Sequence, residues 1–127
     1  MFIEPTGEQI RELLDSAQQG PVVMLNLLKF KADGGEATYR RYGEAVLPIV
    51  GKLGGRLLWQ GRADSVVIGD AAADGWDAVA LVEYPSRQAF IAMVSSAEYQ
   101  AIAGLRSDAL VDSRLIASTQ QYALGET

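Results

Sequence analysis

The feature that most constrains the fold is an apolar run near the N-terminus, from Val22 to Lys31. It reads Val-Val-Met-Leu-Asn-Leu-Leu-Lys-Phe-Lys, and it is too short and too polar at its end to cross a bilayer. Successive side chains of a β-strand point to opposite faces, and in this run both faces are apolar. A strand with one wet face would alternate apolar and polar residues, so the pattern predicts a central strand that is covered on both faces.

One amide, Asn26, interrupts the run on the face that also carries Met24 and Leu28. A buried amide without partners costs about 1 to 3 kcal/mol, so Asn26 is expected to be hydrogen-bonded. Its amide either orients a ligand carbonyl or oxyanion, or it ties down a neighbouring main chain or a buried water. The layer that holds Met24 and Leu28 is therefore expected to hold the candidate site.

Composition excludes several classes of function. The length of 127 residues predicts a single domain that buries a sizeable core. The net charge of -5 argues against binding to nucleic acid or to anionic membranes. The absence of cysteine excludes disulfides and thiolate chemistry, and the first residues lack both a basic start and an apolar signal core, so a cytoplasmic location is expected.

The chain also contains no histidine. This absence removes the commonest general base near neutral pH, the imidazole metal ligand and the proximal ligand of most haem proteins. The carboxylates show no spacing of the kind that calcium-binding loops require. We therefore expect neither a metal ion nor a cofactor.

Turn residues and hydrophobic periodicity predict a helix on each side of the central strand. The first helix spans residues 7–18 behind a capping box formed by Thr6 and Gln9. The second helix follows a mobile loop at residues 32–36 and is capped by Thr38. A proline inside its apolar stripe predicts a bend about one turn earlier.

The following segment reads as two stretches of strand, at residues 56–61 and 65–68, with a bulge or bend at Gly61. Residues 76–84 alternate in part and form the next predicted strand. Ser86 then caps a helix with an apolar stripe.

A short further helix is predicted from a capping box of Ser95 and Glu98, and residues 110–122 form the last strand. Without an N-terminal extension at residues 1–20, the order in residues 21–122 is strand, helix, strand, strand, helix, strand. This is the ferredoxin-like βαββαβ order, an antiparallel α+β sheet with both helices on one face. The other face would stay apolar and uncovered, and since a second copy is its simplest cover, a homodimer is predicted.

Several segments of the chain are similar to those of a known family. They are the central strand, the stretch from Tyr39 to Gly55 with Pro48 and Gly54-Gly55, and then Tyr84-Pro85-Ser86, Ser96-Ala-Glu-Tyr-Gln and Arg106. Together they resemble the dimeric α+β barrel superfamily, and within it the domain-of-unknown-function family thirteen-thirty. The resemblance implies a fold and a dimer, and it implies no particular reaction.

The wider superfamily includes cofactor-free quinone-forming monooxygenases, haem-degrading and chlorite-reducing haem enzymes, and lactone isomerases, with sites in a cavity between sheet and helices. The lack of histidine argues against the haem activities. The oxygenases use Asn, Trp and Tyr, which Asn26, Trp59 or Trp76, and Tyr42 or Tyr99 could supply. No local motif aligns these residues position by position, so their roles are not transferred.

The candidate ligand contacts are Asn26, Tyr42, Tyr99 and Arg106. Arg106 either clamps a carboxylate or enolate in bidentate fashion, or pairs with Glu98, Asp108 or a carbonyl. The tyrosines either contact the ligand or fill space and send their hydroxyls to the rim. The two tryptophans are expected in the core or at dimer contacts.

Three functions remain open at this point. In the first, a homodimeric barrel binds a small, partly apolar and anionic organic molecule through the four candidate contacts. In the second, a cofactor-free oxygenase or isomerase acts on an enolisable or quinol substrate. In the third, the chain is a dimerisation module without a ligand, and Asn26 is fully satisfied by main chain.

Overall fold

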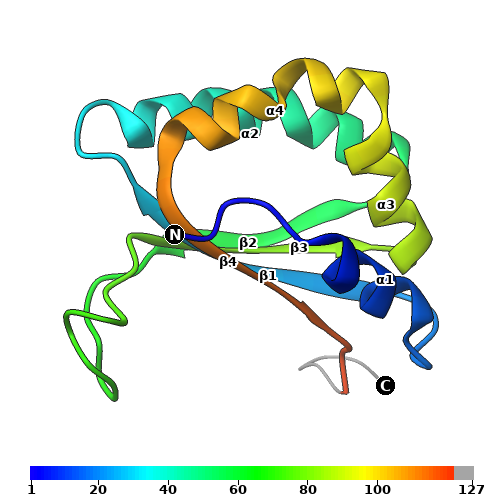
Figure 1. The fold of residues 1–127 in the computed structure, drawn as a ribbon, viewed down its shortest axis with the longest axis horizontal. Coiled ribbons are helices and arrows are strands. Elements are labelled where there is room, and N and C mark those ends of the chain that lie inside the picture. Colours follow the sequence, from blue (N-terminus) through cyan, green and yellow to red (C-terminus); the bar gives the residue numbers. More distant parts are fainter. Residues whose placement is uncertain (122–127) are drawn as a thin grey trace.

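The computed structural model describes residues 1–121, and Figure 1 shows how its elements are arranged. Their order is α1 (Gly7–Asp15), β1 (Val22–Phe30), α2 (Gly35–Lys52), β2 (Arg56–Arg62), β3 (Ala78–Tyr84), α3 (Arg87–Ser95), α4 (Ala97–Ala109) and β4 (Leu110–Ser118). Helices α2 and α4 lie over one face of the sheet, while α1 and α3 lie at one end of it. Within residues 1–121, no helix has the length and apolar character needed to span a membrane.

From β1 onward the elements follow the predicted βαββαβ order, with the second helical segment divided into α3 and α4. The four strands form one antiparallel sheet in the order β2-β3-β1-β4. Strand β1 is an inner strand, paired with β3 on one side and β4 on the other. The predicted ferredoxin-like α+β fold is therefore confirmed.

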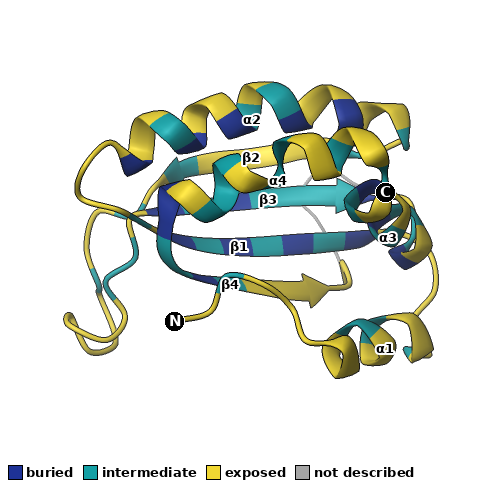
Figure 2. Cartoon of the chain, turned by 45° about the horizontal axis from the view of Figure 1, so that its top comes forward, coloured by how far each residue is buried: buried dark blue, intermediate teal, exposed yellow. Residues whose placement is uncertain are grey.

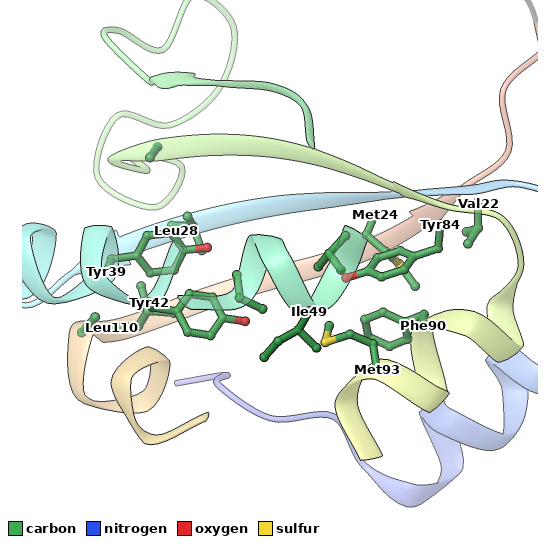
Figure 3. Close-up of a cluster of buried hydrophobic side chains, with 14 residues drawn as sticks. Val22, Met24, Leu28, Tyr39, Tyr42, Ile49, Tyr84, Phe90, Met93 and Leu110 are labelled. Atoms are coloured by element: carbon green, nitrogen blue, oxygen red, sulfur yellow. The ribbon is translucent and has the colours of Figure 1, made fainter. Parts of the chain in front are cut away.

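Alternation along β1 separates the core from the opposite face of the sheet (Figure 2). Met24, Asn26 and Leu28 are buried, whereas Val23 and Leu25 are only half-buried. Met24 and Leu28 belong to a cluster with aromatic and aliphatic side chains from the helices (Figure 3). Asn26 therefore lies in the layer between the sheet and the helices.

The face of the sheet that carries no helix has an apolar patch at its centre. The strand register places Leu81 of β3 and Ile116 of β4 beside Leu25 of β1. Ile116 stays 49% exposed, and Trp59, opposite Leu81 on the edge strand β2, stays 54% exposed. No helix of residues 1–121 lies over this face (Figure 1), so the apolar surface expected from the strand pattern is present.

Helix α2 begins at Gly35 and not behind a cap at Thr38, so the predicted mobile loop is shorter than expected. Gly34 is the N-cap and adopts a φ of 79°, a left-handed conformation that favours glycine. A Cβ on Gly35 would lie 2.6 Å from the carbonyl oxygen of Ala109. The glycine pair thus allows a sharp turn packed against the end of α4, and α2 then continues as one helix through its proline. The bend near that proline stays a prediction.

The predicted strand at residues 65–68 is wrong, because β2 ends at Arg62 and the chain then leaves the sheet. The carboxylate of Asp70 accepts hydrogen bonds from two following main-chain N–H groups, which stabilises a turn. Val67 and Ile68 are 90% and 95% exposed in this loop. Their β-branched side chains suit a strand, but no neighbouring strand is available to them.

The predicted bulge at Gly61 is also wrong. The register of β2 against β3 shifts between Leu57 and Trp59. Gly61 instead leaves space for the Trp59 ring, which a Cβ at that position would overlap. The next strand begins at Ala78, slightly later than the sequence predicted.

The first helix has its predicted N-terminal cap, and both α1 and β4 are shorter than predicted. The Gln9 N–H donates to the Thr6 Oγ1 at 3.1 Å, and the Thr6 N–H donates to the Gln9 Oε1 at 2.9 Å, which confirms the capping box of α1. Helix α1 ends at Asp15, before the predicted residue 18. Strand β4 begins at Leu110 as predicted and ends before Tyr122, which lies outside the described residues.

The predicted cap at Ser95 is displaced by one residue. Ser95 is the last residue of α3, and the extended residue Ser96 begins the next helix. The Ser96 Oγ accepts from the Tyr99 N–H at 3.1 Å, so the pairing of Ser95 with Glu98 does not form. The cap at Ser86 is confirmed.

Candidate functional site

A cavity of about 1060 Å³ lies between the helix-bearing face of the sheet and the helices. The four candidate contacts all line it, and they are Asn26, Tyr42, Tyr99 and Arg106. A smaller cavity of about 590 Å³ lies near Gly34 and Arg62 and contains none of them. The larger cavity is therefore the candidate site.

Most of the cavity wall is apolar. Met24 and Val82 line it from the sheet, and Phe90 and Met93 line it from α3. Figure 3 shows Met24, Phe90 and Met93 close together between the sheet and the helices. Polar residues line the cavity as well, and Glu4 and Glu12 are among them. Polar groups in apolar surroundings interact more strongly than in water, so they decide what the cavity can bind.

Asn26 is 9% exposed and is tied to the sheet through its amide nitrogen. Its Nδ2 donates to the carbonyl oxygens of Met24 at 3.2 Å and Ala80 at 3.4 Å. Because an amide nitrogen has two hydrogens, main chain occupies both, and the oxygen is the free end. No donor from residues 1–121 pairs with this Oδ1, and the atom is not sealed from solvent. Asn26 therefore presents an acceptor, so the predicted contact to an oxyanion is not available.

Tyr42 of α2 and Tyr99 of α4 meet inside the cavity. Their hydroxyl oxygens are 3.0 Å apart, and their rings pack edge to face with centroids separated by 6.2 Å. Tyr39 packs against Tyr42 at 5.3 Å and against Phe30 at 5.5 Å. These rings form an aromatic row that leads from the end of β1 to α4.

Three tyrosines of the cavity, Tyr39, Tyr42 and Tyr84, have raised pKa values and keep their protons at neutral pH. Burial raises the pKa of Tyr42 far above its ordinary value, and the neighbouring Tyr99 raises it further. Burial also raises the pKa values of Tyr39 and Tyr84. A tyrosine whose pKa is raised remains a neutral phenol, so these side chains can form hydrogen bonds but are poor bases.

Arg106 of α4 lies at the same end of the cavity as the aromatic row. Its Nη1 donates to the carbonyl oxygen of Ile3 at 2.8 Å, and its charge opposes the rise that burial causes in the pKa of Tyr39. Of the carboxylates considered from sequence, Glu98 pairs instead with a lysine of α2 at 2.7 Å. No carboxylate of residues 1–121, Asp108 included, forms an ion pair with this guanidinium.

The N-terminal segment, residues 1–18, closes one side of the cavity, which the sequence did not predict. Ile3 and Leu13 line the cavity from this segment. The Ser113 Oγ donates to the carbonyl oxygen of Phe2 at 2.5 Å, and the Arg114 guanidinium lies 4.7 Å from the centroid of the Phe2 ring. The only sequence signal for this role is the apolar stripe of α1, which indicates a packed face but not its partner.

Arg87, the first residue of α3, also lines the cavity, although sequence reasoning does not single it out. It is only 7% exposed, and its Nη1 donates to the carbonyl oxygen of Gln18 at 3.1 Å. Arginine near a helix start is ordinary in a sequence, so no local pattern marks this position. Only the tertiary structure brings it to the cavity.

The two tryptophans do not line the cavity. Trp59 lies on the edge strand β2, opposite Leu81. Trp76 precedes β3, and the Arg114 guanidinium lies 5.0 Å from the centroid of its ring. The oxygenase-like set of Asn, Trp and Tyr is therefore not assembled in one place.

Comparison with known proteins gives a family and a fold. The family model described as Domain of unknown function (DUF1330) matches residues 32–119. No curated protein matches the chain. A crystal structure of a protein of unknown function from Rhodopseudomonas palustris is 32% identical with a TM-score of 0.85, and the match covers 95% of this chain and 98% of that chain.

Two solved structures with lower identity share the fold alone. A dimeric protein of unknown function with a ferredoxin-like fold from Bacteroides fragilis is 12% identical with a TM-score of 0.54, covering 77% of this chain and 94% of that chain. A dabb family protein with a ferredoxin-like fold from Mesorhizobium loti is 14% identical with a TM-score of 0.59, covering 82% of this chain and 100% of that chain. These two structures thus agree with the ferredoxin-like fold expected from the sequence.

Proposed function

The chain belongs to the family described as domain of unknown function DUF1330, and from this premise we propose that it is a homodimeric barrel that binds a small organic anion in its cavity. The observation that carries the proposal is the Arg106 guanidinium, which lines a largely apolar cavity without a carboxylate partner in residues 1–121. A cation in such a wall is stabilised when an anion meets it.

The other polar groups refine the chemistry of the ligand. The Asn26 Oδ1 accepts a hydrogen bond, so it suits a ligand hydroxyl or N–H group. One hydroxyl of the Tyr42–Tyr99 pair donates to the other, which leaves the second hydrogen available to a ligand acceptor. The apolar walls accommodate an aliphatic or aromatic body. The proposed ligand is thus amphipathic, with an anionic group and an apolar body, and the Asn26 Oδ1 can accept a hydrogen bond from a ligand that carries a donor.

Self-association is proposed from the uncovered face of the sheet. Leu25, Leu81 and Ile116 lie side by side there, and Ile116 is half exposed. Apolar surfaces of this kind mark interaction sites in soluble proteins, and a second copy supplies a complementary apolar face. The Bacteroides fragilis structure of similar fold is that of a dimeric protein, which supports the same arrangement for this chain.

The alternative of a cofactor-free oxygenase or isomerase has less support. Proton abstraction would need a base, and burial keeps Tyr42 protonated. Stabilisation of an enolate by Asn26 would need the amide hydrogens, which are engaged with main chain. A dimerisation module without a ligand would need no open acceptor in its core. Binding is therefore the function that we propose.

Isothermal titration calorimetry with octanoate and phenylacetate tests the proposal. We expect the wild type to bind at least one of them, and Arg106→Met to weaken that binding by about tenfold or more, because a charge-assisted pair is lost. Arg41→Met is the matched control, since this exposed arginine of α2 does not line the cavity. Equal affinities of the Arg106 variant and the wild type, or no carboxylate binding at all, would contradict the proposal.

A further inference from the structure

The guanidinium of Arg87 is only partly used by the protein. Its Nη1 donates to the carbonyl oxygen of Gln18 at 3.1 Å. Its Nε is buried and has no partner, and it is the one such side-chain atom among the described residues. No hydrogen bond to a group of residues 1–121 involves Nη2, and this nitrogen is not sealed from solvent. The edge formed by Nε and Nη2 therefore has no partner in residues 1–121, and Arg87 is one of the residues that line the cavity.

A buried donor without an acceptor costs about 1 to 3 kcal/mol, and the cost is larger for a charged group. Arg87 is 7% exposed and forms no ion pair with a carboxylate of residues 1–121. The edge formed by Nε and Nη2 is the one on which a carboxylate accepts two parallel hydrogen bonds. The geometry of this edge thus suits a planar anion such as a carboxylate.

Arg87 and Arg106 lie at opposite ends of the cavity. Arg106 interacts with Tyr39, whose ring packs on the last residue of β1. Arg87 follows shortly after Tyr84, which pairs with Val22, the first residue of β1. A strand rises about 3.3 Å per residue, so the length of β1 keeps the two arginines well apart. One anionic group cannot serve both.

The wall between the two arginines is mainly apolar. Met24 and Val82 line this stretch from the sheet, and Val46 and Val50 line it from α2. Methylene or aromatic carbon atoms bury favourably in such surroundings, whereas a charge in the middle of the ligand would be desolvated without a counter-charge. The middle of the ligand is therefore apolar.

We propose that Arg87 is a second anion contact of the binding site, and that the ligand class is an elongated dicarboxylate with an apolar middle. The inference rests on the proposed function, because the other carboxylate is the one assigned to Arg106. It deepens that function from a single organic anion to a molecule with an acidic group at each end. Neither the apolar cavity nor Arg106 alone requires the second acidic group.

Calorimetry with matched probes tests the second contact. Linear dicarboxylates from hexanedioate to dodecanedioate are compared with monocarboxylates of the same chain length. We expect the wild type to bind the best dicarboxylate at least about tenfold more tightly than its monocarboxylate, as one further charge-assisted contact would give. Arg87→Met should remove this preference for the dicarboxylate, whereas Arg106→Met should weaken the binding of both probes. Arg41→Met serves again as the control.

A second measurement keeps the test valid if Arg87→Met does not fold. The Nε–Hε signal of Arg87 in a proton–nitrogen NMR spectrum is assigned from its loss in Arg87→Lys. We expect the dicarboxylate to shift this signal in the wild type, and the monocarboxylate to leave it in place.

The outcomes separate the two proposals. A wild type that binds both probes equally, or an Arg87 signal that the dicarboxylate does not move, would overturn the second contact. If monocarboxylate binding then still depends on Arg106, the proposed function stands alone. If neither class of probe binds, both proposals fall.

Discussion

At the residue scale, the orientation of one amide decides what the cavity can recognise. Asn26 directs its Nδ2 towards two carbonyl oxygens of the sheet, because those oxygens can only accept. Its Oδ1 is left as an acceptor on an otherwise apolar face. For the proposed ligand, Asn26 would therefore accept from a hydroxyl or N–H group and would not contact an oxyanion.

This orientation predicts the effect of Asn26→Asp, which changes the side-chain shape little. A carboxylate would face the carbonyl oxygens of Met24 and Ala80, and it can donate to neither. We expect a loss of about 2 to 4 kcal/mol in the free energy of unfolding at neutral pH, measured by urea denaturation. Asn26→Leu removes the same hydrogen bonds without adding charge and should lose less. If Asn26→Asp is as stable as the wild type, the amide nitrogen does not face the sheet.

At the element scale, the junction between β1 and α2 depends on close backbone packing. Gly34 adopts a left-handed conformation, and Gly35 touches the end of α4. This contact fixes where α2 begins, and hence where Tyr39 and Tyr42 meet the cavity. The position of the aromatic row is thus set by a turn that contains no functional side chain.

A pair of alanine substitutions in α2 tests this packing. Gly35→Ala would place its Cβ 2.6 Å from the Ala109 carbonyl oxygen, so we expect a loss of about 1 to 3 kcal/mol in unfolding free energy. Gly51→Ala, in the same helix, meets nothing within 4 Å and should gain about 0.5 to 1 kcal/mol from helix propensity. Chemical denaturation measures both. If Gly35→Ala is instead stabilising, the end of α4 can shift away from the new Cβ at little energetic cost.

At the scale of the whole molecule, the sheet has two apolar faces and the helices cover only one of them (Figure 1). Val23, Leu25 and Leu27 of β1 face away from the helices and are half-buried, and the register places the apolar Leu81 and Ile116 beside Leu25. A second copy would cover this face without touching the cavity on the other side. The proposed binding and the proposed self-association would therefore use opposite faces of one sheet.

Light scattering coupled to size exclusion tests the proposed dimer. We expect the wild type to be dimeric at micromolar concentration and Ile116→Glu to be monomeric, because the substitution places a charge in an apolar interface. Leu14→Glu is the control, since it changes an exposed apolar residue of α1, a helix without buried residues. A monomeric wild type, or a dimeric Ile116 variant, would count against the helix-free face as the interface.

Local patterns determined the element order, because strand alternation and capping depend on neighbours in the chain. The run that includes Asn26 predicted the inner strand, and the pair Thr6 and Gln9 predicted a cap that forms. Local patterns failed where a strand or a bulge depends on pairing with a segment far away in the chain. Val67 and Ile68 resemble a strand, yet no partner strand reaches them, and the bulge of β2 is placed by its register with β3.

Strand alternation and helical spacing, which are read one segment at a time, predicted the class of fold and placed Asn26 on one face of β1 with Met24 and Leu28. The four polar residues singled out from sequence all line the cavity. Only the tertiary structure decided which atoms those residues present, that the N-terminal segment closes the cavity, and that Arg87 reaches it. Hydrogen-bond partners and burial depend on segments that are far apart in the chain. The spacing of residues within one segment does not predict which distant segments will come into contact.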